Sequence, residues 1–303
     1  MEKILITTTS FAEYDDSGLE LLRQNGLKIV LNPYKRKIKE EEIIELARGA
    51  IGIIAGTENI SRDTLMKLPD LRVISRCGAG LDSIDLAAAK ELSIEVLNTP
   101  DAPTIAVAEL TVGLILSLLR KIIAMDVLLR AGKWEKMMGN LLNGKKIGIL
   151  GFGRIGKKVA ALLGPFGCSI SYYDPLVEPG VTGSNRLSKE DLIKWADILT
   201  VHVSTKELVL GKGELSSMKK GAWLINVSRG GNVDESSLYE LLKDGYLGGA
   251  SLDVFENEPY RGSLKELSNV ILTPHIGSYA KEARVKMELE AVNNLLKGLR
   301  ERR

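Results

Sequence analysis

The sequence predicts an α/β protein built from two doubly wound parallel-sheet domains. Its 303 residues exceed what a single hydrophobic core usually organises. Short β-branched runs alternate with amphipathic helical stretches along the chain, which favours parallel sheets with helices on both faces. Two prolines, Pro100 and Pro103, interrupt this alternation, because they forbid a continuing helix or a central strand. We therefore expect one sheet before this break and another after it.

The first series of elements precedes the break. Short apolar runs indicate buried strands at residues 3–7, 27–31, 50–55, 71–75 and 94–97. Helical patterns lie between them at residues 19–24, 39–48 and 85–92. The first two of these helices are followed by Gly26 and Gly49, and glycine is a common stop signal. After the break, residues 105–119 form an apolar helix, which we interpret either as a buried helix between the domains or as part of a dimer interface.

The second series contains six expected strands. They are residues 146–150, 169–173, 198–203, 222–227, 250–254 and 270–272. Residues 232–243 are expected to form a helix with Asn232 as its N-cap, Glu235 at capping-box spacing and Gly245 just past its end. A last helix is expected over residues 280–299. Six parallel strands are enough for a complete dinucleotide-binding sheet.

Composition excludes several classes of protein. Lys and Arg number 41 against 39 Asp and Glu, so a net charge of +2 provides no bulk attraction to nucleic acid or to a membrane surface. Cys77 and Cys168 match neither a disulfide framework nor a zinc spacing, so we expect no metal. No signal peptide is visible, and the longest apolar run, residues 112–119, is far shorter than the roughly 20 residues of a membrane span. We expect a soluble protein of the cytoplasm.

A glycine-rich loop follows the first strand of the second series and opens a helix. The residues expected to meet a cofactor there are Gly151, Gly153, Arg154, Ile155 and Gly156, in a G-x-G-x-x-G pattern. These glycines allow a tight turn, close approach of a pyrophosphate and close packing of helix on strand, while the helix N-terminus attracts phosphate. The next strand ends in Asp174, whose carboxylate suits ribose hydroxyls and repels a 2′-phosphate. We therefore expect NAD rather than NADP.

Three later strands of this series end in polar segments. The carboxyl ends of parallel strands lie at one edge of their sheet. We therefore expect Arg229, Glu258 and His275 to lie close together there. The guanidinium fork suits a carboxylate, and histidine exchanges protons near neutral pH. A neighbouring carboxylate orients the imidazole and raises its pKa. The only other histidine, His202, ends an apolar strand, and we interpret it as a histidine at the edge of the core near the cofactor.

These motifs resemble the D-isomer-specific 2-hydroxyacid dehydrogenase family over essentially the whole chain. The resemblance is carried by the glycine loop with Asp174 and by residues 227–230, 253–259 and 274–277. It implies that Arg229 binds the substrate carboxylate and carbonyl, that His275 is the acid/base and that Glu258 is its partner. It also implies cofactor contacts from Ser228 and Asp253, and a homodimer.

The family resemblance also implies a division of the chain into domains. A Rossmann-type NAD domain would span residues 99–279, and a discontinuous, flavodoxin-like substrate domain would span residues 1–98 and 280–303. In the latter, residues 76–82 are similar to the family's substrate loop, whose backbone N–H groups at Gly78 and Ala79 would receive the substrate carboxylate.

Within the family, the sequence is most similar to the branch that oxidises 3-phosphoglycerate to 3-phosphohydroxypyruvate in serine biosynthesis. Arg76 and Lys136 are candidate cations for the phosphate. Glu58 is a departure from this branch, because a carboxylate repels phosphate. No C-terminal regulatory domain follows, so we expect no serine feedback through one. The alternatives are a reductase of glyoxylate, hydroxypyruvate or another 2-keto acid and, more distantly, a non-enzymatic NAD(H)-sensing protein like the family's co-repressors.

Overall fold

The computed structural model describes residues 1–177 and 184–301, which divide into two compact units. Unit 1 comprises Met1–Pro103 with Ser278–Arg303, and unit 2 comprises Thr104–Gly277. The predicted domain crossings, after residues 98 and 279, lie a few residues from these limits, and the last two residues of the predicted range 280–303 lie outside the described residues. Each unit holds one parallel sheet covered by helices, so the predicted fold class is confirmed.

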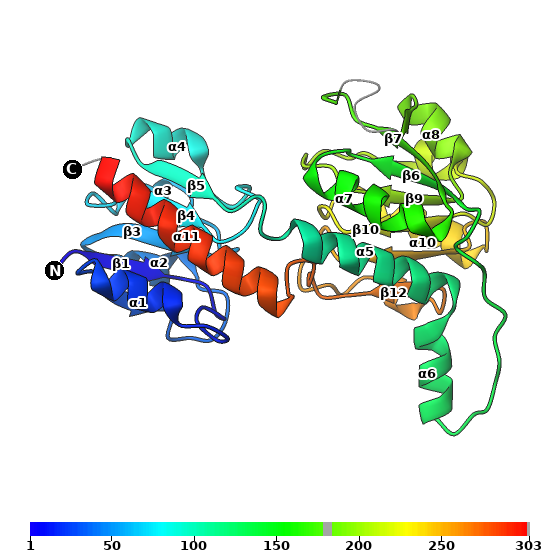
Figure 1. Cartoon of the computed structure of the whole chain (residues 1–303), viewed down its shortest axis with the longest axis horizontal. Helices are drawn as coiled ribbons and strands as arrows, with labels where there is room; N and C mark the ends of the chain where they lie inside the picture. Colours follow the sequence, from blue (N-terminus) through cyan, green and yellow to red (C-terminus); the bar gives the residue numbers. More distant parts are fainter. Residues whose placement is uncertain (178–183, 302–303) are drawn as a thin grey trace. The chain divides into compact units, whose positions relative to one another are not determined.

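Unit 1 is built on a five-stranded parallel sheet in the order β2-β1-β3-β4-β5 (Figure 1). Its strands are β1 (Lys3–Ile6), β2 (Lys28–Leu31), β3 (Ala50–Ala55), β4 (Val73–Arg76) and β5 (Glu95–Asn98). Its helices are α1 (Ser17–Gln24), α2 (Glu40–Leu46), α3 (Arg62–Met66), α4 (Leu86–Glu91) and α11 (Lys281–Glu301).

Alternating side chains of unit 1 pack into a core on each face of the sheet. Ile4 and Ile6 of β1 point into a core that α1 and α11 close, while Leu5 between them points into the core under α2, α3 and α4. Every residue of β3 is buried, because helices cover both faces of this central strand. The chain passes from β1 to β2 on one side and then crosses back over β1 to β3 on the other, so the strand order reverses between β1 and β3.

Unit 2 is built on a seven-stranded parallel sheet in the order β12-β11-β10-β9-β6-β7-β8. Its strands are β6 (Lys146–Leu150), β7 (Ser169–Tyr173), β8 (Asn185–Arg186), β9 (Ile198–Val201), β10 (Trp223–Asn226), β11 (Gly249–Leu252) and β12 (Val270–Leu272). Its helices are α5 (Thr104–Leu119), α6 (Ile122–Arg130), α7 (Arg154–Leu163), α8 (Lys189–Trp195), α9 (Lys212–Ser217) and α10 (Glu235–Lys243). Helices α5 and α7 cover one face, and α8, α9 and α10 the other.

The structure adds several short elements to those expected. Strand β8 has two residues, and the helices α3, α8 and α9 have five to seven residues. Helix α6 also was not predicted, and it stands off the body of unit 2 (Figure 1) with no buried residue. Among the described residues, no helix combines the length and the apolar character that crossing a bilayer requires.

The predicted N-cap of α10 is wrong. The helix begins at Glu235, and the Asp234 side chain caps it by accepting from Ser237 N. Asn232 is instead fully buried, and its Nδ2 donates to the carbonyls of Thr205 and Glu207 at 2.9 and 2.8 Å. Asn and Asp are both common N-cap residues. Asn232 instead satisfies two carbonyls near it, so Asp234 serves as the N-cap.

Candidate functional site

The carboxyl edge of the unit 2 sheet collects most of the predicted site residues. Each follows a strand of that sheet, and the strand order reverses between β6 and β9 at the point where β6 meets the glycine loop. The residues at this edge are Gly151, Asp174, His202, Arg229, Asp253, Glu258 and His275. Residues far apart in sequence are thus brought to one place.

The glycine loop is shaped by close backbone approaches. Gly151 has a φ of +88°, and a Cβ there would lie 2.6 Å from the carbonyl carbon of His202. A Cβ on Gly156 would lie 2.2 Å from the carbonyl oxygen of Gly151. By contrast, a Cβ on Gly153 would meet nothing within 4 Å among the described residues. The first and third glycines therefore close the turn, and the second faces open space.

The first turn of α7 fits a pyrophosphate. Gly153 is its N-cap, and no described side chain caps the helix, so the positive end of α7 faces the glycine loop, where an anion would bind. The Arg154 side chain is exposed, while Ile155 packs against the core. These residues fit the diphosphate of a dinucleotide cofactor.

Asp174 stands beside this loop at the end of β7. Its Oδ2 accepts from Phe152 N at 2.7 Å and its Oδ1 from Leu176 N at 2.8 Å. These bonds fix the carboxylate against the glycine loop, and each oxygen keeps a further lone pair for a hydroxyl. The position suits an adenosine ribose next to a bound pyrophosphate.

His202 packs beneath the glycine loop. Its backbone N–H donates to Leu150 O at 2.7 Å, and the ring Nε2 lies 2.9 Å from Thr200 Oγ1. Its Nδ1 is buried and has no partner among the described residues. Burial lowers the pKa of His202 to about 3, so the ring stays neutral near pH 7 and does not serve as a proton donor there.

His275 and Glu258 form the pair that the sequence predicted. His275 Nδ1 lies 2.9 Å from Glu258 Oε2, and Glu258 Oε1 accepts from Phe255 N at 3.1 Å. The Glu258 hydrogen bond is the main cause that raises the pKa of His275, and the charge of Asp253 adds to it. The charge of Arg229 opposes the rise, so the guanidinium lies within electrostatic range of the imidazole.

Asp253 holds the segment that carries His275. The carboxylate is buried; its Oδ1 accepts from Thr273 Oγ1 at 2.6 Å and Ile276 N at 2.8 Å, and its Oδ2 from Gly277 N at 2.8 Å. Burial is the main cause that raises the pKa of Asp253. These bonds fix a turn in which His275 has a left-handed φ of +54°. Asp253, expected to contact the cofactor, thus holds the segment that carries His275.

Arg229 lies in the loop after β10, which packs closely against the segment after β11. A Cβ on Gly230 would lie 1.8 Å from Phe255 O, so only glycine lets the segment after β10 meet the segment that carries Glu258. The guanidinium Nη1 donates to Ser228 O at 2.8 Å. The Ser228 hydroxyl, expected at the cofactor, is buried and donates to Asn226 Oδ1 at 2.7 Å.

Three residues that position this site were not among the predicted site residues. Asn226, Asn232 and Thr273 hold the loops that bear Arg229 and His275, through hydrogen bonds at 2.6–3.1 Å. Asn226 and Thr273 come directly after apolar strand residues of the second series, and that position was the available signal. No group of three or more His, Cys, Asp or Glu in residues 1–177 and 184–301 is placed to hold a metal ion.

The predicted substrate-binding residues fall in different units. In unit 1, Gly78 N donates to Thr99 Oγ1 at 2.8 Å, so this amide is already engaged. The Arg76 guanidinium lies over Gly78 and donates to Cys77 O. Ala79 N–H meets no acceptor among the described residues. Lys136 is exposed in unit 2, in the irregular segment after α6.

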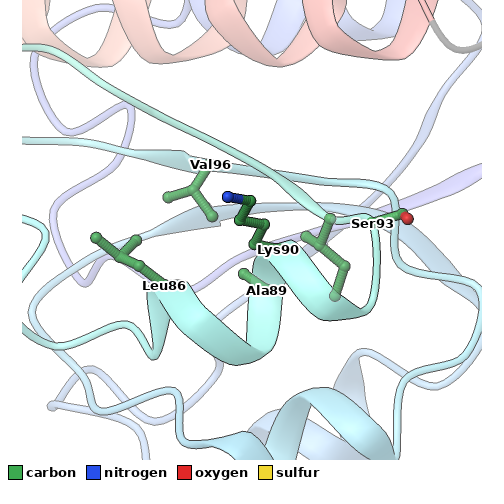
Figure 2. A pocket seen from close by; sticks show the side chains of 6 residues that line it. Leu86, Ala89, Lys90, Ser93 and Val96 are labelled. Carbon is green, nitrogen blue, oxygen red and sulfur yellow. The ribbon is translucent and has the colours of Figure 1, made fainter.

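Unit 1 also has a surface pocket of about 370 Å³ between α4 and β5 (Figure 2). Its lining is mainly apolar, with one ammonium and one hydroxyl group, and consists of Leu86, Ala89, Lys90, Ser93, Ile94 and Val96. None of the predicted site residues is among them.

Comparison with known proteins agrees with this geometry. A family model described as the NAD binding domain of D-isomer specific 2-hydroxyacid dehydrogenase matches residues 112–277. The chain belongs to this family. Unit 2 is accordingly its NAD-binding domain, and the predicted family and cofactor are confirmed.

Individual relatives match along nearly the whole length of this chain. A D-3-phosphoglycerate dehydrogenase of Homo sapiens is 37% identical over 294 residues, which cover 93% of this chain and 54% of that protein. The chain thus spans about half the length of that relative. A glyoxylate reductase of Thermococcus litoralis is 36% identical over 297 residues, 90% of each chain. The crystal structure of the TT0316 protein from Thermus thermophilus superposes with a TM-score of 0.92 at 33% identity, covering 99% of this chain and 97% of that one.

Proposed function

We propose that the protein is an NAD-dependent dehydrogenase that interconverts a D-2-hydroxy acid and its 2-keto acid. The observation that carries the proposal is the His275–Glu258 pair, 2.9 Å apart, with Arg229 within electrostatic range at the carboxyl edge of the NAD-binding domain. The nicotinamide of bound NAD(H) would exchange a hydride with C2 of the acid. The remaining tasks, holding the carboxylate and moving the hydroxyl proton, fall to side chains of this chain.

The hydrogen bond to Glu258 determines which ring nitrogen of His275 exchanges a proton with the substrate. A carboxylate only accepts, so Nδ1 carries the proton and donates to Glu258, which leaves Nε2 to face substrate. In oxidation, Nε2 takes the hydroxyl proton while the C–O bond becomes a carbonyl; in reduction, it returns that proton to the carbonyl oxygen. Arg229 would hold the carboxylate and polarise the carbonyl, because its fork matches both oxygens of an acid.

Two substrates follow from the relatives. The 37% identical D-3-phosphoglycerate dehydrogenase supports 3-phosphoglycerate, with Arg76 and Lys136 as phosphate contacts and a role in serine biosynthesis. The 36% identical glyoxylate reductase supports glyoxylate, hydroxypyruvate or another small keto acid. The burial of Glu58 in unit 1, which would form the substrate domain, favours this second class.

A panel assay tests the function and the cofactor preference together. NADH consumption is followed with glyoxylate, hydroxypyruvate and 3-phosphohydroxypyruvate, and NADPH replaces NADH in parallel. We expect turnover with at least one acid and a preference for NADH of about tenfold or more, since Asp174 repels a 2′-phosphate. The Asp174→Ala variant should lose most of that preference. Tight NADH binding without turnover of any acid would instead support a cofactor-sensing protein.

We also propose that two copies of the chain pair through α6 and the segment after it. Helix α6 has nine residues and no buried side chain, and an isolated helix of that length is marginal in water. Apolar side chains are exposed in both parts, including Val127, Trp134 at 82% and Met138 at 89%. A twofold interface would bury the same patch on both copies. Sedimentation equilibrium should give about twice the 33.1 kDa of one chain, and the monomer mass at micromolar concentration would contradict the proposal.

A further inference from the structure

We infer that Glu58 is a built-in anion at the carboxyl edge of the unit 1 sheet and determines substrate specificity by excluding a phosphate. The inference rests on the proposed function and narrows its substrate class to small, unphosphorylated 2-hydroxy and 2-keto acids. It is drawn from the position of Glu58, from the donors that it occupies and from the hydrogen bonds of two arginines in the same unit.

Glu58 sits where an open parallel sheet most often binds ligands. In the order β2-β1-β3-β4-β5 the direction of winding reverses between β1 and β3, and ligands of such sheets bind outside the carboxyl ends at this reversal. The loops that leave β1 and β3 begin at Thr7 and Gly56. Glu58 lies in the second of these loops and reaches back across both.

The Glu58 carboxylate takes the donors that an anionic ligand would use. Its Oε1 accepts from Gly56 N at 2.8 Å and from the Thr7 hydroxyl, and the side chain is 2% exposed. The hydroxyl of Thr8, next to Gly56, is buried without a partner among the described residues. This edge of the sheet therefore has hydrogen-bond donors that suit an anion, and the Glu58 carboxylate occupies two of them.

A second carboxylate fixes the loop from its other side. Glu40 of α2 accepts from Asn59 Nδ2 and from the hydroxyls of Ser61 and Thr64. These hydrogen bonds lower the pKa of Glu40 to about 2, against an opposing effect of burial, so it stays charged near pH 7. With the loop clamped on both sides, the Glu58 side chain has little freedom to swing away from an incoming phosphate.

Two arginines of unit 1 already donate to other groups of that unit, and the Nε of Arg284 is buried without a partner among the described residues. Arg284 donates to Glu288 Oε1 at 3.1 Å and to Ser10 Oγ at 2.8 Å, and the Arg76 guanidinium donates to Cys77 O. A phosphate would need such a cation, and it would also meet the fixed charge of Glu58 in a partly dehydrated setting, where repulsion is stronger than in water. A substrate whose distal group is neutral, or is a hydroxyl that can donate to Glu58, needs no cation and is not repelled.

The test compares 3-phosphohydroxypyruvate with hydroxypyruvate in the wild type and in Glu58→Gln. The amide keeps an acceptor for Gly56 N–H and removes the charge. We expect the wild type to favour hydroxypyruvate in kcat/KM. In the variant, the ratio of the phosphorylated to the unphosphorylated substrate should rise by about tenfold or more. Glu58→Ala, which frees the donors completely, should shift the ratio in the same direction.

Glu40→Gln is the matched control, because it loosens the same loop without changing the charge that faces the two strands. Its melting temperature should fall while the substrate ratio stays at the wild-type value. An unchanged ratio in both Glu58 variants, or a wild type that prefers the phosphorylated acid, would overturn the inference.

A binding experiment separates this inference from the proposed function. Inorganic phosphate at millimolar concentration should raise the melting temperature of Glu58→Gln and leave those of the wild type and Glu40→Gln unchanged. If the wild type reduces no keto acid, the proposed function fails, and the phosphate-dependent melting still decides whether Glu58 blocks an anion site. Equal phosphate stabilisation of all three proteins would contradict the role of Glu58.

Discussion

Replacing His275 with glutamine is expected to lower kcat by about 10²–10⁴-fold, the usual contribution of a positioned acid/base. Glutamine retains hydrogen-bonding groups at this position but exchanges no proton near neutral pH. The dissociation constant of NADH, measured by fluorescence titration, should change little, because the glycine loop and Asp174 belong to other strands of the sheet. A weakened NADH complex with kcat preserved would contradict the assigned role.

The pH dependence supplies a second measurement on the same group. Glu258 raises the pKa of His275 above its ordinary 6.5, so the imidazolium persists to higher pH. Reduction needs the protonated ring, and its rate should be high at low pH and fall as the pH rises through this raised pKa. Oxidation needs the neutral ring and should show the opposite trend. In Glu258→Gln the main cause of the raised pKa is gone, so both transitions should move to lower pH.

Replacing Arg229 with lysine should reduce kcat/KM by about 10- to 200-fold, which is the loss of one hydrogen bond to a charged group. A lysine retains the charge, but its ammonium cannot reproduce the planar fork that meets both oxygens of a carboxylate. We expect KM to rise and kcat to fall together, because the side chain would hold the carboxylate and polarise the carbonyl. Steady-state kinetics with the best acid of the panel measures both constants.

Arg261→Lys is the control for this change, since Arg261 is an exposed arginine of the same domain. It should leave kcat and KM at their wild-type values. Wild-type kinetics in Arg229→Lys would mean that the guanidinium does not bind the substrate carboxylate.

Much of the fold follows from local patterns. The strands of both sheets are recognisable because buried parallel strands form nearly continuous apolar runs, as in the wholly buried β3. The exceptions have physical reasons: β8 is two residues long, and α6 buries no side chain, so neither leaves the periodic signature of burial. The start of α10 differs from the prediction because Asn232 is drawn into a buried network, and Asp234 caps the helix instead.

The sequence by itself determined which chemical groups this protein can bring to its site: the glycine loop, the acid that follows the next strand, and one arginine, one glutamate and one histidine after three later strands. Spacing and residue type are sufficient there, because parallel strands deliver their ends to one edge. Only the tertiary structure decided which partners the polar groups of the two units meet. Gly78 N–H is bonded to Thr99, Asp253 holds the His275 segment, and Glu58 turns inward onto Thr7 and Gly56. These contacts join residues up to 51 positions apart, and each polar group took the partner that folding brought within reach.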